Sequence, residues 1–183
     1  ISFWSKNFIQ TANIDATVTK FWDDADDAGG VPGDKYNDDN DATSTGLNEG
    51  FFPIGSGGST KFTGEYDGGG HSISGLTIKR TSTSKVGLFG DTDGATIRNL
   101  RVTNADIAGS SWVGSLVGIA RSTTIDNCAV SGGIVTSVSL TGGLVGYAYC
   151  PSGSCTNGII RNSYSTASVI DGGSGQTGGL VGF

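Results

Sequence analysis

Two short sequence elements alternate along this 183-residue chain, and both recur at a nearly regular spacing. The first is an apolar pair enclosed by glycine, as in Gly142-Gly-Leu-Val-Gly146, and the second is a short apolar segment that begins with isoleucine. A recurrence of about 20 to 50 residues is typical of solenoid proteins, in which a single repeat cannot bury its apolar face alone. The recurrence therefore restricts the possible folds more strongly than the composition does.

The spacing of the two elements gives the length of one repeat. The glycine-enclosed elements contain leucines that are spaced 28, 28 and 36 residues apart: Leu88, Leu116, Leu144 and Leu180. The second elements begin with isoleucines that are spaced 24, 28 and 35 residues apart: Ile73, Ile97, Ile125 and Ile160. We therefore expect stacked units of about 28 residues.

The longest spacing has a local cause. The next isoleucine follows the leucine after nine residues in two of the units, but after sixteen residues between Leu144 and Ile160. The additional residues contain a short loop from Cys150 to Cys155, which we interpret as an insertion at a turn. We expect these two cysteines to form a disulfide, which is typical of an oxidising, extracytoplasmic compartment; the alternative is two free thiols in a loop. The remaining Cys128 is expected to be a small buried hydrophobic residue.

The units consist of short apolar segments bounded by Gly, Asn, Asp and Ser, a pattern typical of strands joined by tight turns. We therefore predict an all-β fold, a parallel β-solenoid (β-helix), right-handed as parallel crossovers usually are. Stacking at about 4.8 Å would place the leucines in one internal column and the isoleucines in a second, with Leu100 above Cys128. Asn99, Asn127 and Asn162 also align, and we expect an asparagine ladder at a corner because asparagine tolerates a left-handed backbone.

Charge divides the chain into two parts. The formal net charge is −6, but residues 21–50 hold nine acidic residues and one base, while all other residues hold eight acids and ten bases. We expect residues 1–60 to form an N-terminal capping coil with an acidic insertion at 22–50, and residues 61–183 to form the solenoid. Ten of the sixteen aromatic residues lie in the first 66 positions, which favours a bulky cap over a binding site.

The acidic insertion is the best candidate for a binding site, because loop carboxylates are the hard oxygen ligands that Ca²⁺ prefers. Four aspartates could converge there as ligands: Asp34, Asp38, Asp39 and Asp41. A second set of ligands could come from Asp23, Asp24, Asp26 and Asp27. The EF-hand template fits poorly, since Ala42 and Thr43 stand where it needs a ligand and a glycine. The alternative is a solvated acidic loop that keeps the protein soluble.

Composition argues against several activities. A sequence pI of about 4.5 does not favour binding to nucleic acid, and no apolar run approaches the ~20 residues that span a bilayer. A zinc peptidase needs two histidines and a glutamate, whereas the chain contains one histidine, His71. A polysaccharide lyase or hydrolase needs a cluster of charged residues on one face. The aspartates of the repeats are scattered, and we interpret them as turn residues: Asp91, Asp93, Asp106, Asp126 and Asp171.

The Gly-Gly-Leu-Val-Gly elements and the intervening Ile-x-Asn-Cys/Ser segments resemble the GLUG motif of bacterial surface proteins. Residues 8–15, 50–55 and 62–78 are similar to the segments that accompany those repeats, so the resemblance covers most of the chain outside residues 22–49. GLUG repeats occur in large secreted adhesins of the filamentous-haemagglutinin kind and in the non-catalytic region of IgA-cleaving zinc metallopeptidases. The resemblance implies a β-solenoid scaffold at the cell surface and a structural role for His71 at a turn.

We therefore expect a non-catalytic secreted or cell-surface β-solenoid that acts as a stalk or adhesive module. Its partner would be a cell-surface glycan or protein, which Trp22 and Tyr36 could contact, or another copy of the chain. The last repeat stops at Phe183 without a polar cap, so we expect the solenoid to continue beyond this point or to abut another chain. The alternatives are a filament subunit that assembles end to end and a carbohydrate-active β-helix enzyme. Neither membrane insertion nor any cofactor besides Ca²⁺ is expected.

Overall fold

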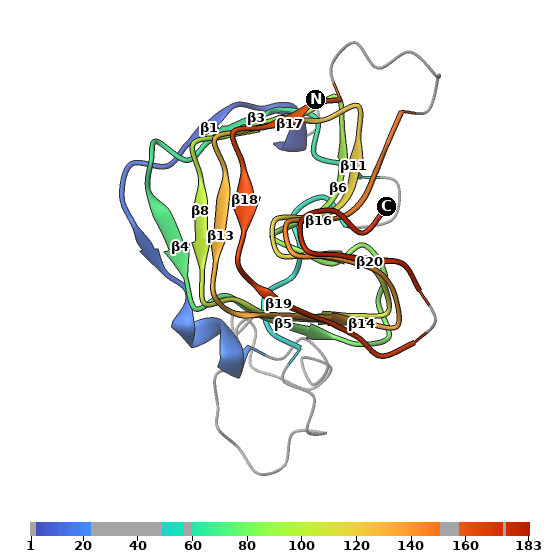
Figure 1. The fold of residues 1–183 in the computed structure, drawn as a ribbon. Helices are drawn as coiled ribbons and strands as arrows, with labels where there is room; N and C mark the ends of the chain where they lie inside the picture. The colour runs from blue at the N-terminus through green and yellow to red at the C-terminus, as the bar shows by residue number, and fades with distance from the viewer. Residues whose placement is uncertain (1–2, 23–48, 57–59, 151–157, 174) are drawn as a thin grey trace.

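The computed structural model describes residues 3–22, 49–56, 60–150, 158–173 and 175–183. Short strands follow one another through these residues, and two 3₁₀ helices, η1 (Phe3–Ser5) and η2 (Thr17–Phe21), lie near the start. Every pairing between the named strands is parallel, and the strands form five sheets. Figure 1 shows the chain winding repeatedly around one axis, with equivalent strands stacked on one another. The predicted parallel β-solenoid is confirmed.

Two of the sheets contain five strands each. Sheet 1 has the order β1 (Phe8–Ile9), β3 (Glu65–Asp67), β7 (Thr96–Arg98), β12 (Thr124–Asp126) and β17 (Ile160–Arg161). Sheet 2 has the order β2 (Ile14–Asp15), β4 (Ser72–Ser74), β8 (Arg101–Thr103), β13 (Ala129–Ser131) and β18 (Tyr164–Ser165).

The other three sheets are narrower. Sheet 3 has the order β5 (Thr77–Arg80), β9 (Asp106–Gly109), β14 (Ile134–Ser137) and β19 (Ser168–Asp171). Sheet 4 consists of β10 (Ser111–Gly114), β15 (Ser139–Gly142) and β20 (Thr177–Gly178). Sheet 5 consists of β6 (Phe89–Asp93), β11 (Val117–Arg121) and β16 (Val145–Tyr149).

One coil of the solenoid passes through all five sheets in turn. The strands β7 to β11 form one such coil, and β12 to β16 form the next. Partners in these two coils are 28 residues apart, as in Ile97 with Ile125 and Val117 with Val145. Because equivalent side chains lie above one another, each coil covers the apolar interior of the coil before it.

The glycine-enclosed elements form the turn between sheets 4 and 5. The register places their leucines at one position of successive coils, where all four belong to the core or pack against it: Leu88, Leu116, Leu144 and Leu180. Figure 1 shows the chain folding back toward the middle of the coil beside β16 and β20. A Cβ atom added at Gly146 would lie 2.4 Å from the backbone nitrogen of Val113 in the preceding coil. Glycine is therefore required where the backbones of the two sheets touch.

The predicted isoleucine column is wrong at its first member. Three of the isoleucines pair with one another in sheet 1: Ile97, Ile125 and Ile160. Ile73 instead pairs with Val102 in sheet 2, and Tyr66 takes the position beside Ile97. The corners on either side of sheet 2 both place Asn or Gly two residues after an apolar residue, so the same sequence pattern fits both corners.

Asparagines form the corner between sheets 1 and 2. The backbone of Asn99, Asn127 and Asn162 is left-handed, with φ angles of 55°, 52° and 53°. Nδ2 of Asn127 donates a hydrogen bond to Oδ1 of Asn99 at 2.9 Å. Asn162 instead donates to Asp126 at 3.0 Å, and Asn99 donates to Asp67 at 3.0 Å. The corner is thus an amide ladder that carboxylates extend.

The segments before β3 form an incomplete coil on the first complete one. β1 pairs with β3, and β2 pairs with β4. Aromatic rings pack between this incomplete coil and the next one. The ring centre of Phe62 lies 6.1 Å from that of Phe8 and 5.0 Å from that of Phe89. The buried Arg80 holds residues 49–51, because Nη1 binds Oε2 of Glu49 at 2.6 Å and Nη2 donates to the carbonyl oxygen of residue 50 at 3.2 Å.

The cysteine-containing insertion follows β16 and precedes β17 in the sequence. Cys150 is disulfide-bonded, and Cys155 lies outside the described residues. Cys128 is buried and free, at the position that Leu100 occupies in the preceding coil. Burial raises the pKa of the Cys128 thiol to about 11, so this side chain remains a neutral member of the core at physiological pH.

None of the described helices is long and apolar enough to cross a membrane.

Candidate functional site

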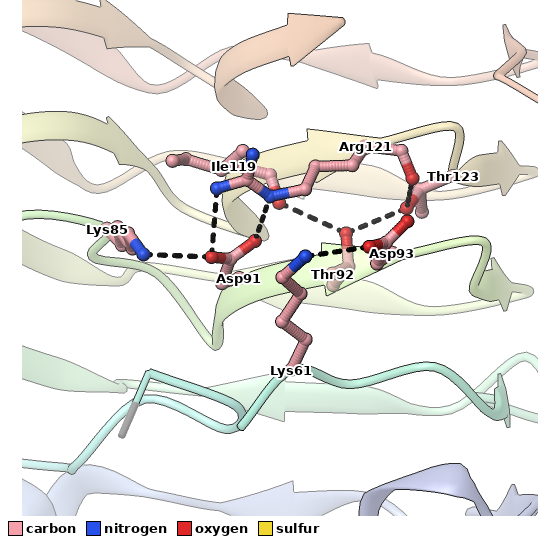
Figure 2. A network of polar contacts seen from close by, with 8 residues as sticks. All are labelled: Lys61, Lys85, Asp91, Thr92, Asp93, Ile119, Arg121 and Thr123. Carbon is pink, nitrogen blue, oxygen red and sulfur yellow. Dashed lines mark hydrogen bonds and ion pairs between the residues drawn. The ribbon is translucent and has the colours of Figure 1, made fainter. Parts of the chain in front are cut away.

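A buried network of ion pairs lies on sheet 5, and Figure 2 shows its members. Asp91 on β6 is at its centre, with a side chain that is 2% exposed. Nζ of Lys85 donates a hydrogen bond to Oδ2 of Asp91 at 3.0 Å. Arg121 on β11, in the next coil, donates from Nε to Oδ1 at 2.8 Å and from Nη2 to Oδ2 at 3.1 Å. One carboxylate thus joins two coils through a bidentate guanidinium contact.

The electrostatics of the network follow from these contacts. Burial by itself would raise the pKa of Asp91, but hydrogen bonds from Arg121 and Lys85 outweigh burial and hold this pKa below its usual range. The hydrogen bond to Asp91 raises the pKa of Arg121 in turn. Asp91 therefore stays ionised at neutral pH, and its oxygens are engaged by two cations. This arrangement suits the alignment of neighbouring coils better than proton transfer to a substrate.

Further polar contacts continue along β6. Lys61 binds Oδ2 of Asp93 at 2.7 Å, and Figure 2 shows its side chain reaching this carboxylate from a neighbouring segment. On the inner side of the strand, Oγ1 of Thr92 donates to the carbonyl oxygen of Ile119 at 3.1 Å and lies 2.8 Å from Oγ1 of Thr123. Both threonines are buried. The side chains of β6 therefore bind the next coil on both faces of the sheet.

Aromatic side chains follow the charged ones along sheet 5. The guanidinium carbon of Arg121 lies 5.0 Å from the ring centre of Tyr149. The ring of Tyr147 stacks against Tyr149 at 4.9 Å and against Phe183 at 5.4 Å. The two tyrosine side chains are partly buried, whereas Phe183 at the end of the stack is exposed. The stack extends the contacts between coils as far as the last described coil.

Sheet 1 carries a second set of ion pairs on its outer face. The register brings four residues of alternating charge to one position of successive coils: Asp67, Arg98, Asp126 and Arg161. Nη2 of Arg98 lies 3.0 Å from Oδ2 of Asp67, and Nη2 of Arg161 lies 2.8 Å from Oδ2 of Asp126. A hydrogen bond from Asn99 lowers the pKa of Asp67, and a hydrogen bond from Arg161 lowers the pKa of Asp126.

The prediction that the scattered aspartates are turn residues is wrong for four of the five, whereas Asp171 accepts a hydrogen bond from the backbone nitrogen of Gly173 at 2.9 Å, as a turn residue does. All five lie within strands: Asp91, Asp93, Asp106, Asp126 and Asp171. Four of them form ion pairs with cations of other segments or coils: Asp91, Asp93, Asp106 and Asp126. The sequence spacing contained two usable signals: Asp93 with Arg121 and Arg98 with Asp126 are each one 28-residue period apart and pair in the register. Opposite charges at the repeat distance indicate a contact between coils.

The other predicted sites have mixed outcomes. The proposed Ca²⁺ ligands lie outside the described residues: Asp34, Asp38, Asp39 and Asp41. Within the described ranges, no group of three or more His, Cys, Asp or Glu side chains could hold a metal ion.

His71 lies directly before β4. Its backbone nitrogen donates a hydrogen bond to the carbonyl oxygen of residue 68 at 2.8 Å, and its carbonyl oxygen accepts one from the backbone nitrogen of Arg101 at 3.1 Å. His71 therefore lies in the tight connection between sheets 1 and 2.

The fold is a parallel β-solenoid whose neighbouring coils are also linked by buried and exposed ion pairs. The chain is similar to a segment of halomucin from Haloquadratum walsbyi, with 36% identity over 138 residues. The similarity covers 73% of this chain but 1% of the length of halomucin. No family model and no solved structure match the chain.

Proposed function

We propose that this chain is a non-catalytic scaffold module of a secreted or cell-surface protein, in which it acts as a stalk or adhesive segment. The observation that carries the proposal is the constant register from coil to coil, with charges paired along the solenoid axis. Such stacking builds a stiff rod one coil at a time. The resemblance to GLUG repeats and the similarity to a small segment of a very long protein support a module within a larger surface structure.

The charges of sheet 5 also favour a scaffold over an enzyme. A general acid must hold a proton near its working pH, and a carboxyl achieves this through burial or a nearby like charge. Asp91 is buried, but its two cationic partners lower its pKa instead. Its carboxylate contributes to the packing of the coils in its ionised form.

Surface location can be tested on intact cells of the source organism. An antibody raised against the folded chain should label unpermeabilised cells, and mild external protease should remove that label. A cytoplasmic protein serves as the control for cell integrity. Labelling that appears only after permeabilisation would contradict the proposed location.

The non-catalytic and adhesive parts of the proposal need a separate experiment. The full chain is incubated with a panel of polysaccharides, and both reducing-end release and binding to immobilised glycans are measured. We expect binding without turnover, and heat-unfolded chain is the control for non-specific adhesion. Release of new reducing ends in proportion to chain concentration would overturn the assignment as a non-catalytic module.

A second candidate function is end-to-end assembly into a filament. Large apolar side chains are exposed in both the first and the last described coils, including Ile9 and Ile14 at one end and Ile170 and Phe183 at the other. Light scattering after size-exclusion chromatography should then show mass that increases with concentration. Phe183→Asp should abolish this increase, whereas Val138→Asp, at an exposed apolar position between β14 and β15, should not. A constant monomer mass at millimolar concentration would eliminate the filament.

A further inference from the structure

An apolar pocket of about 240 Å³ lies at the N-terminal end of the solenoid and is partly open to solvent, since Ile14 and Val18 in its lining are exposed. It separates the coil that begins with β3 from the segments that precede that coil. Apolar side chains form both walls: Ile73, Leu76 and Leu88 on one side and Trp22, Phe51 and Ile54 on the other. The rings of Trp22 and Phe51 are 6.1 Å apart and inclined at 37°. Buried apolar side chains thus meet partly exposed ones around the pocket, which leaves an apolar surface accessible from solvent.

The polar side chains in the lining already have partners. Thr19 forms hydrogen bonds with two backbone groups, and the hydroxyl of Tyr66 lies 3.1 Å from Oε1 of Gln10. Asp15 accepts a hydrogen bond from the backbone nitrogen of Thr17 at 3.0 Å. A molecule in the pocket would therefore not need to supply hydrogen bonds, and a polar molecule would lose its own contacts with water.

We propose that this pocket binds a small neutral molecule built on one aromatic ring. An enclosed apolar protein cavity of about 150 Å³ takes up benzene, so an apolar pocket of about 240 Å³ has room for a substituted ring. The inclined rings of Trp22 and Phe51 offer the offset and edge-on contacts that aromatic groups prefer. The proposal is independent of the role of the chain as a surface scaffold.

The lining also discriminates against anions. Asp15 is the acidic residue of the lining, and hydrogen bonds from Thr17 hold its pKa below the usual range. Its carboxylate is exposed and screened by water, so the main penalty for an anion is the loss of its hydration among the apolar side chains. Toluene and benzoate are close in size and differ in charge, so this pair tests the chemical class of the ligand.

The first experiment uses the full chain with toluene and with benzoate. Toluene should raise the midpoint of thermal unfolding progressively as its concentration increases, because it binds the folded state alone. It should also shift the NMR signals of Ile73, Leu76 and Leu88. Benzoate should bind at least tenfold more weakly. The proposal is overturned if toluene near its solubility limit changes neither the unfolding midpoint nor these signals.

Two variants locate the site. Ala16→Leu adds bulk to a buried residue of the lining, and Val18→Phe adds bulk at a lining position that is 56% exposed and therefore tolerant. Either folded variant should raise the dissociation constant of toluene at least tenfold. Val138→Phe is the control, since Val138 is 53% exposed and lies outside the pocket. Unchanged affinity in Val18→Phe would overturn the proposal.

Discussion

Asp91 shows how much a single residue contributes to the alignment of the coils. Its carboxylate is the common partner of Lys85 and Arg121, and removal of one member of a buried charge network leaves the others without compensation. Asp91→Asn should lower the free energy of unfolding by about 3 kcal/mol, measured by urea titration. Asp106→Asn is the matched control, because Asp106 pairs with Lys79 at a position that is 47% exposed. Its loss should stay below about 1 kcal/mol, and equal losses would contradict the special role of the buried pair.

The pH dependence of stability follows from the same residue. The pKa of Asp91 is lower in the folded chain than in the unfolded chain, where an aspartate titrates near about 3.9. Its contribution is therefore complete above about pH 5, where the aspartate is ionised in both states, and is lost as pH falls through the lower folded pKa. The difference in unfolding midpoint between wild type and Asp91→Asn should shrink between pH 5 and pH 2. A difference that stays constant over this range would contradict the assignment.

Ser115 is the opposite case, a polar group that costs stability. It is 1% exposed, and its hydroxyl has no hydrogen-bond partner among the described residues. Ser115→Ala should raise the free energy of unfolding by about 1 kcal/mol, because an unsatisfied buried hydroxyl is removed. Ser137 is also 1% exposed but binds Ser139 and Thr141, so Ser137→Ala should lower stability. Destabilisation by both substitutions in thermal unfolding would contradict this distinction.

At the scale of the structural element, the turn between sheets 4 and 5 depends on glycine. A Cβ atom at Gly146 would lie 2.4 Å from the backbone nitrogen of Val113, and neither backbone can move without loss of sheet pairing. Gly146→Ala should therefore cost about 3 kcal/mol of unfolding free energy. Gly179 belongs to the same motif, but an added Cβ atom there meets nothing within 4 Å. Gly179→Ala should have little effect in the same urea titration, and similar losses for both would contradict the close-contact argument.

The corners show where sequence patterns succeed and where they mislead. The predicted left-handed backbone at Asn99, Asn127 and Asn162 is confirmed, because few other residues adopt it without strain. The assignment of Ile73 failed because two consecutive corners share one local pattern. A short motif encodes the geometry of a corner but not which corner of the coil it forms. That choice depends on pairing with a strand about 28 residues away.

For the whole molecule, the stack predicts a gradient of local stability. In the coil from β7 to β11, the strands β7, β8, β9 and β11 each have a hydrogen-bonded neighbour on both sides. The strands β17 to β20 each lie at the end of their sheet and have one neighbour. Amide hydrogen exchange, measured by NMR, should therefore be slowest in β7, β8 and β11 and fastest in β18 and β20. Equal protection throughout would mean that the chain unfolds as one unit, without fraying from the ends.

The sequence by itself determined the solenoid, the length of its coil and the position of its glycine turn. Each of these depends on a local pattern repeated at one period, and repetition makes stacking the way to bury the leucines. Tertiary structure alone decided the partner of Ile73, the burial of Asp91 between two cations and the pocket beside Trp22. These features join the repeats to one another or to the non-repeating start of the chain. Such contacts depend on register and side-chain packing, which the repeat period does not specify.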